Sequence, residues 1–156
     1  LAVLLRAVAN GIAWLRERLN TAEWAASVET EQRTVGQLIQ HIAWAWEAES
    51  AAFRAIASGS AGSGWTQEWL DAQNAEQARI SANLSRREVM GRYCASRDLA
   101  IAFIRSLSPA ALERSGYHMP GEPERTVAGW IETCLIGHPR EHLPEIKLKA
   151  LKLKDS

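Results

Sequence analysis

Apolar residues recur every three or four positions in four long stretches of the chain, and this spacing constrains the fold more than any other feature. The stretches are residues 1–20, 34–58, 85–107 and 126–144. In the first of them the repeat consists of Leu4, Leu5, Val8, Ile12, Leu15 and Leu19. This period is typical of an α-helix with one apolar face. Four such helices must bury their apolar faces against one another, so the sequence predicts an all-α protein built as a four-helix bundle.

Helix-capping signals mark where two of these helices begin. Thr34 with Gln37, and Ser85 with Glu88, have the spacing of a capping box. In this arrangement the two side chains bind backbone amides that the first turn of a helix leaves without partners. Residues 59–64 contain only glycine, serine and alanine, so they predict a loop between two helices.

The remaining segments are more polar. Residues 65–84 have a mostly polar helical pattern, and residues 116–124 predict a loop because they contain two glycines and two prolines. No stretch shows a clear strand pattern. Pro139 removes one hydrogen bond and is expected to kink the last helix. We expect that helix to end near Pro144, and residues 145–156 to form a solvated tail.

The composition favours one domain that spans residues 1–156. The chain is 47% hydrophobic and 23% charged, and 18 basic side chains balance 18 acidic ones. A protein that binds nucleic-acid phosphates normally carries a basic excess. No apolar run reaches the roughly 18–20 residues of a membrane span, and two cysteines are too few for a disulfide framework. We therefore expect a cytoplasmic protein that binds neither nucleic acid nor membrane.

Two histidines, His138 and His142, lie four residues apart in the last predicted helix. Residues at this spacing share one helix face, one turn apart. The apolar residues on the same face are Val127, Ile131, Cys134 and Leu135. Both histidines are therefore expected to point toward the core. A buried histidine needs a hydrogen-bond partner or a metal ion, and the pattern alone leaves both alternatives open.

A third histidine, His41, lies about 10 Å from the start of the second predicted helix, at 1.5 Å per residue. His138 and His142 lie about 3–9 Å from the predicted end of the last helix. If these two helices are antiparallel, all three histidines meet at one end of the bundle. Three imidazoles suit zinc, nickel, iron or copper better than magnesium or calcium. Three protein ligands plus water are typical of a catalytic rather than a structural zinc site.

Four further polar residues are relevant to this site. Glu49 lies near the middle of an apolar helix face, about 12 Å along the axis from His41, and we expect it to pair with an inward-facing arginine. His118 lies in the predicted loop and is expected to be exposed. Glu141 and Glu145 lie close to the histidine pair, where either carboxylate could orient a ligand imidazole. Glu145 is the better candidate because it shares a face with the first histidine of the pair.

Three segments resemble a known family. Residues 34–42 read Thr-Val-Gly-Gln-Leu-Ile-Gln-His-Ile, residues 69–74 read Trp-Leu-Asp-Ala-Gln-Asn, and residues 138–146 read His-Pro-Arg-Glu-His-Leu-Pro-Glu-Ile. With these segments the chain resembles the DinB/YfiT-like family of metal-dependent four-helix-bundle proteins. That family has one ligand histidine near the start of its second helix, which matches His41. It has a further pair on its last helix, which matches His138 and His142. Pro139 departs from the family pattern, where a polar residue is common.

The resemblance implies an up-down-down-up bundle, a divalent metal that is commonly zinc or nickel, and a homodimer. Some members of the family are similar to enzymes that use a low-molecular-weight thiol, such as mycothiol-dependent maleylpyruvate isomerase and bacillithiol S-transferases. The resemblance therefore implies a small-molecule substrate and a reaction of the hydrolase, transferase or isomerase type.

The sequence is compatible with three functions. The first is a metal-dependent enzyme with His41, His138 and His142 as ligands. The second is a non-catalytic module in which the metal only ties two helices together, and a fourth protein ligand such as His118 would favour it. The third is a metal-free bundle whose histidines are satisfied by carboxylates.

Overall fold

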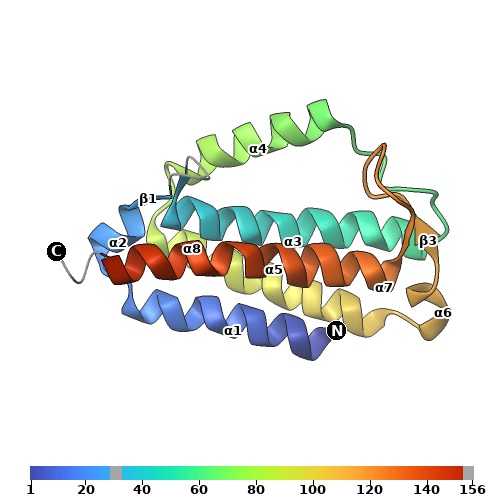
Figure 1. Cartoon of the computed structure of the whole chain (residues 1–156), viewed down its shortest axis with the longest axis horizontal. Coiled ribbons are helices and arrows are strands. Elements are labelled where there is room, and N and C mark those ends of the chain that lie inside the picture. Colours follow the sequence, from blue (N-terminus) through green and yellow to red (C-terminus); the bar gives the residue numbers. More distant parts are fainter. Residues whose placement is uncertain (29–32, 153–156) are drawn as a thin grey trace.

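Helices occupy most of the chain, as the sequence predicted. The computed structural model describes residues 1–28 and 33–152, apart from the side chains of residues 15, 16, 145 and 148–152. The elements in chain order are α1 (Ala2–Arg18), α2 (Thr21–Ala25), β1 (Ser27–Val28), β2 (Arg33–Thr34), α3 (Val35–Ala57), α4 (Gln67–Ser81), α5 (Arg86–Ser106), α6 (Pro109–Leu112), β3 (Ser115–Gly116), β4 (Arg125–Thr126), α7 (Val127–Trp130), the π-helical η1 (Ile131–Gly137) and α8 (His138–Lys152). The long helices lie roughly along one direction (Figure 1).

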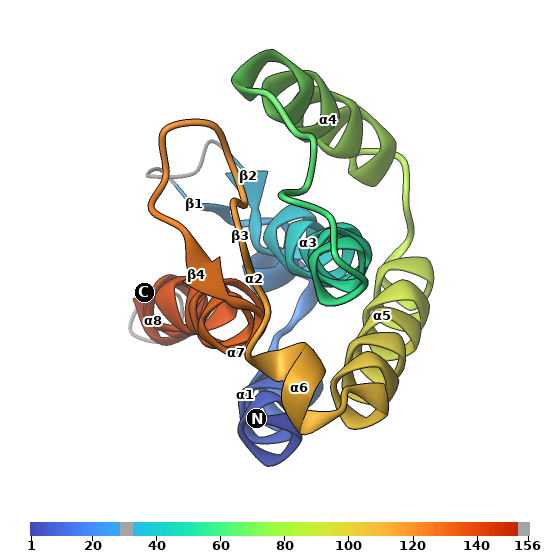
Figure 2. The same cartoon turned by 90° about the vertical axis from the view of Figure 1, so that its right-hand side faces the viewer.

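Helix α3 is the most buried of the long helices and lies between the others. In the end-on view it is flanked by α5, by α4 and by the segment α7–η1–α8 (Figure 2). Large side chains fill the core, and the largest fully buried ones are Trp46, Phe53, Tyr93, Phe103 and Trp130. The mostly polar helix α4 contributes little to this core, since Ser81 is its one buried residue among those described.

The capping signals are confirmed. Thr34 and Gln37 bind each other's backbone amides at the start of α3. Ser85 and Glu88 do the same at the start of α5. These side chains satisfy amide donors that the first turn would otherwise leave unpaired.

In the part of the chain that the structure describes, four short strands are present where no strand was expected. β1 pairs with β2, and β3 pairs with β4, each through only two residues per strand. Strands of two residues are too short to show an alternating pattern, which is why the sequence did not reveal them. β2 and β4 both consist of an arginine followed by a threonine, and in each case the threonine caps the next helix.

The expected end of the last helix at Pro144 is wrong, because α8 continues to Lys152. Ile146 is completely buried, so packing outweighs the hydrogen bond that Pro144 removes. The predicted tail at residues 145–156 is thus helical as far as residue 152, and residues 153–156 lie outside the described chain. A kink was expected at Pro139. The irregular segment is instead the π-helical η1, one turn earlier, and the regular helix α8 begins at His138.

Helix α3 and the last helical segment are antiparallel. Three contacts show this: His41 meets His138, Trp46 meets Leu135, and Phe53 meets Trp130. As the residue number rises along α3, the number of the contacting residue falls. This is the arrangement that a three-histidine site requires. Within the described ranges, no helix combines the length and the apolar character needed to cross a membrane.

Candidate metal centre

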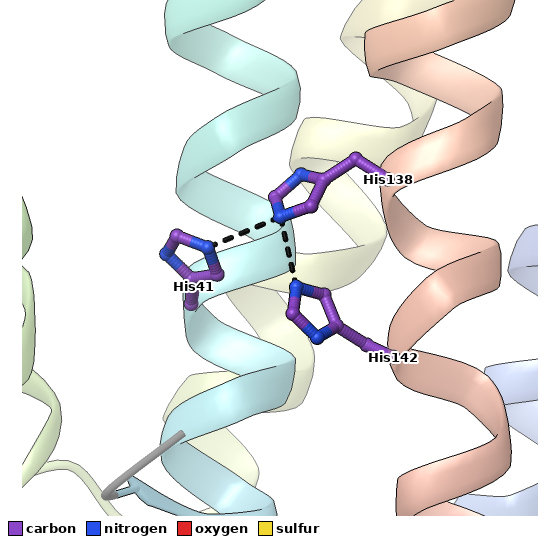
Figure 3. Close-up of side chains that lie close together, drawn as sticks. All are labelled: His41, His138 and His142. Carbon is purple, nitrogen blue, oxygen red and sulfur yellow. Dashed lines mark hydrogen bonds between the residues drawn. The ribbon is translucent and has the colours of Figure 1, made fainter. Parts of the chain in front are cut away.

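The structure brings together the three histidines that the sequence singled out. His41 projects from the second turn of α3, and His138 and His142 project from the first two turns of α8 toward it (Figure 3). The Nε2 atom of His138 lies 3.3 Å from that of His41 and 2.8 Å from that of His142. One ring nitrogen from each histidine lies within 4.8 Å of the other two.

Burial keeps two of these imidazoles neutral. His41 and His142 are buried, and His138 is half-buried. Burial, with the positive charge of Arg33 and the neighbouring histidines, lowers the pKa of His41 to about 2. Burial, with His142 and Arg33, lowers the pKa of His138 to about 4. At neutral pH both rings are therefore uncharged, which is the form that binds a metal.

The 3.3 Å distance between the ring nitrogens of His41 and His138 fits a metal ion, and the 2.8 Å distance between those of His138 and His142 is shorter than in a metal site. Zinc–nitrogen bonds of about 2.0–2.1 Å place two nitrogens of a tetrahedral site about 3.3–3.4 Å apart. A neutral ring nitrogen carries either one hydrogen or one lone pair, so hydrogen bonds alone serve the two contacts of His138 poorly. The other ring nitrogen of His41, Nδ1, is buried and has no hydrogen-bond partner. Three lone pairs aimed at one cation account for the cluster better than hydrogen bonding does.

A pocket of about 300 Å³ lies beside the cluster. Two of the three histidines, His41 and His138, form part of its wall. The other lining residues are Trp44, Ala45, Glu49, Leu70, Asn74, Thr133, Cys134 and Glu141. They come from α3, α4, η1 and α8, so the polar helix α4 serves to cover the pocket. A metal ion bound by the three histidines would face this space.

Of the two carboxylates expected near the site, Glu141 is exposed and lines the same pocket. The side chain of Glu145 lies outside the described part of the chain. A role for either carboxylate in orienting a histidine remains a prediction.

The expectations for His118 and Glu49 are wrong. His118 is 8% exposed, not solvated, and its Nε2 atom lies 2.8 Å from Oε2 of Glu49. Glu49 thus has a histidine beside it, where an arginine was expected. The sequence signal was present, because an acid on an apolar helix face needs a partner. The path of the loop that supplies His118 depends on tertiary contacts, which a single sequence does not reveal.

His118 does not join the three-histidine cluster. Among the residues whose side chains are described, that cluster contains His41, His138 and His142 alone, while His118 belongs to a separate group with Glu49 and Cys134. The fourth ligand that would indicate a closed structural site is therefore not His118.

Comparison with protein families decides the classification. The sequence model of the DinB superfamily matches residues 4–146, which is most of the chain. The chain belongs to the DinB superfamily. This superfamily is metal-binding, and among the described residues of this DinB-superfamily chain the three clustered histidines form one group that could hold a metal ion. Comparisons with curated proteins and with solved structures found no similar protein.

Proposed function

We propose that this chain is a metal-dependent enzyme in which His41, His138 and His142 hold one zinc or nickel ion. The observation that carries the proposal is that the three ring nitrogens converge at the wall of a pocket of about 300 Å³. The described side chains offer three ligands, so a coordination position is left for water or substrate. A site of this kind is typical of catalytic metal centres.

The bound ion would lower the pKa of a coordinated water or of a small-molecule thiol, and so supply a nucleophile at neutral pH. The protein contributes the shape and polarity of the pocket. Trp44 and Leu70 provide apolar walls, and Oδ1 of Asn74 lies in the lining with no hydrogen-bond partner. This oxygen is suited to accept a hydrogen bond from a small polar substrate. We therefore propose a hydrolase or a thiol-dependent transferase or isomerase.

The finer features implied by the family form part of the proposal. We propose an up-down-down-up bundle, and the helix directions in Figure 1 support it: α3 and α5 run one way, whereas α1 and the segment α7–η1–α8 run the other. We also propose a homodimer in the cytoplasm. Three apolar side chains of α1 support a contact surface, since Val3, Leu4 and Trp14 are each at least half exposed.

The enzyme proposal is tested by asking whether the metal has an open position. Cobalt(II) replaces zinc as a coloured probe, and the Cys134→Ala variant is used so that the spectrum reports on the histidine cluster alone. Azide is then titrated into the cobalt-loaded protein. We expect the visible spectrum to change in a saturable manner, because azide replaces a coordinated water. The His142→Ala version of the same protein is the control and should show no such change.

An unchanged spectrum, with cobalt bound, would contradict the enzyme proposal. It would mean that protein side chains complete the coordination and would favour a structural metal. Failure to bind cobalt at all would instead contradict the metal assignment itself.

A further inference from the structure

A second group of metal-ligating side chains lies near the same pocket, and two of its three members line it. It consists of Glu49 from α3, His118 from the loop between β3 and β4, and Cys134 from η1. One ligand atom from each lies within 4.8 Å of the other two. The group shares no residue with the three-histidine cluster and contains three different kinds of donor.

The contact between Glu49 and His118 is close but is not a satisfied hydrogen bond. Oε2 of Glu49 and Nε2 of His118 are 2.8 Å apart, which is an ion pair when the ring is protonated, but the geometry is too poor for either atom to count as hydrogen-bonded. Glu49 is 9% exposed and His118 is 8% exposed. Two buried polar atoms left in this state cost free energy unless something binds both. A cation held between them would do so.

The other ring nitrogen of His118, Nδ1, contacts Glu122, and this contact favours the tautomer that can bind a cation through Nε2. Nδ1 of His118 lies 3.1 Å from Oε2 of Glu122, and the same oxygen accepts the backbone N–H of Met119. In the neutral ring whose hydrogen is on Nδ1, that hydrogen is directed to Glu122 and Nε2 carries a lone pair that a cation can bind. Metal-bound histidines commonly donate their other N–H to a carboxylate in this way. Without a proton or a cation on Nε2, its lone pair would face the Glu49 carboxylate.

Cys134 supplies the third donor and makes the charges balance. Burial, together with the negative charges of Glu49 and Glu122, raises the pKa of the Cys134 thiol. A free thiolate is thus disfavoured at this position, which argues against a role as an isolated nucleophile. A divalent cation would be neutralised by one thiolate and one carboxylate, and a neutral site is the form that a buried position tolerates best.

Aromatic rings surround one side of the group, where His118 and Trp65 also line a separate pocket, and the other side faces the pocket of the histidine cluster. The rings of Phe53, Trp65 and Trp130 pack around His118 at centroid distances of 5.7, 5.1 and 5.3 Å. Glu49 and Cys134, in contrast, line the pocket that His41 and His138 also line. Glu49 follows His41 by eight residues on α3, about 12 Å along the axis. That is too far for a two-metal centre, whose ions lie about 3.5–4 Å apart.

We propose that Glu49, His118 and Cys134 form a second metal site, which faces the same pocket as the three-histidine cluster. Thiolate, imidazole and carboxylate donors together suit zinc, whereas magnesium and calcium prefer oxygen ligands. Glu122 acts as a positioning residue that orients His118. The proposal is independent of whether the three-histidine site is catalytic.

Cobalt(II) tests the second site, because only a thiolate ligand gives a sulfur-to-cobalt charge-transfer band in the near ultraviolet. The metal-free full chain is titrated with cobalt under reducing, oxygen-free conditions. We expect two equivalents to bind and the band to appear. Cys134→Ala should bind one equivalent and lose the band. Cys94→Ala is the matched control, since Cys94 is the other free, half-buried cysteine, and it should keep both equivalents and the band.

Two further variants separate this site from the histidine cluster. His142→Ala should lose one equivalent and keep the band, so a failure of the three-histidine site is distinguishable from a failure of the second site. Glu122→Gln should keep the band but weaken the cobalt affinity about 10–100-fold, as expected for a residue that orients a ligand. Circular dichroism establishes that each variant is folded. The proposal is overturned if the folded wild type shows no charge-transfer band, or if the band survives in Cys134→Ala.

Discussion

The indole N–H of Trp46 donates a hydrogen bond of 2.9 Å to the backbone carbonyl of Leu135. Leu135 lies in the π-helical η1, and the residue that would donate to this carbonyl in α-helical pairing, Pro139, has no N–H. Trp46, which is completely buried, supplies a donor in its place. The bond joins α3 to the helical segment just before His138. It therefore helps to fix the register in which His41 faces the histidine pair.

Replacing Trp46 by phenylalanine should destabilise the protein. The carbonyl of Leu135 would lose the indole donor, and leaving a buried polar group unsatisfied costs about 1–3 kcal/mol. Urea unfolding of the metal-free protein measures the loss. In a Pro139→Ala background the loss should be smaller, since residue 139 then offers an N–H. An equal loss in both backgrounds would show that the bond and the proline are not coupled.

The two capping boxes should respond differently to pH. Ser85→Ala and Thr34→Ala should each remove a cap worth about 1 kcal/mol at neutral pH. Hydrogen bonds from the Ser85 hydroxyl and amide hold the pKa of Glu88 below its ordinary value. A carboxyl with a lowered pKa stabilises the fold above its unfolded-state pKa, and this stabilisation is lost as the pH falls through the folded-state value.

The effect of Ser85→Ala should therefore shrink in acid. Gln37 does not titrate, so the effect of Thr34→Ala should stay constant over the same range. Urea unfolding of the three proteins from neutral pH to below the ordinary pKa of glutamate makes the comparison. Parallel pH profiles for the two variants would contradict the role assigned to Glu88.

Metal removal should leave the fold intact. The core side chains, including Leu5, Ile42 and Tyr93, are buried without any contribution from a metal. After chelation, circular dichroism should still show a helical protein that melts cooperatively. Zinc at about 100 times its dissociation constant should then raise the unfolding free energy by about 2.7 kcal/mol for one site. A random-coil spectrum after chelation would contradict this expectation.

The helices could be predicted from sequence because their signals are local. The apolar repeat of residues 34–58 and the cap at Thr34 predicted α3 to within a residue at each end. The alignment of His41 with His138 and His142 followed from one further assumption, that two helices are antiparallel.

Other features depend on tertiary contacts and could not be predicted in the same way. The continuation of α8 past Pro144 depends on the burial of Ile146 against the rest of the fold. The position of His118 beside Glu49 depends on the path of a loop with no periodic pattern. The second cluster was missed for this reason, although the acid on the apolar face of α3 was a signal that a partner existed.

The assignment of His41, His138 and His142 as a unit is tested most directly by isothermal titration with zinc. Cys134→Ala serves as the parent, so that the second cluster does not contribute. The parent should bind one equivalent, and adding His41→Ala, His138→Ala or His142→Ala should weaken binding severely, because two ligands remain. Adding His118→Ala or Arg140→Ala should leave the affinity unchanged, because the former belongs to the other cluster and the latter is exposed. Normal zinc binding by the His41→Ala protein would contradict the account, since the metal would then not link α3 to α8.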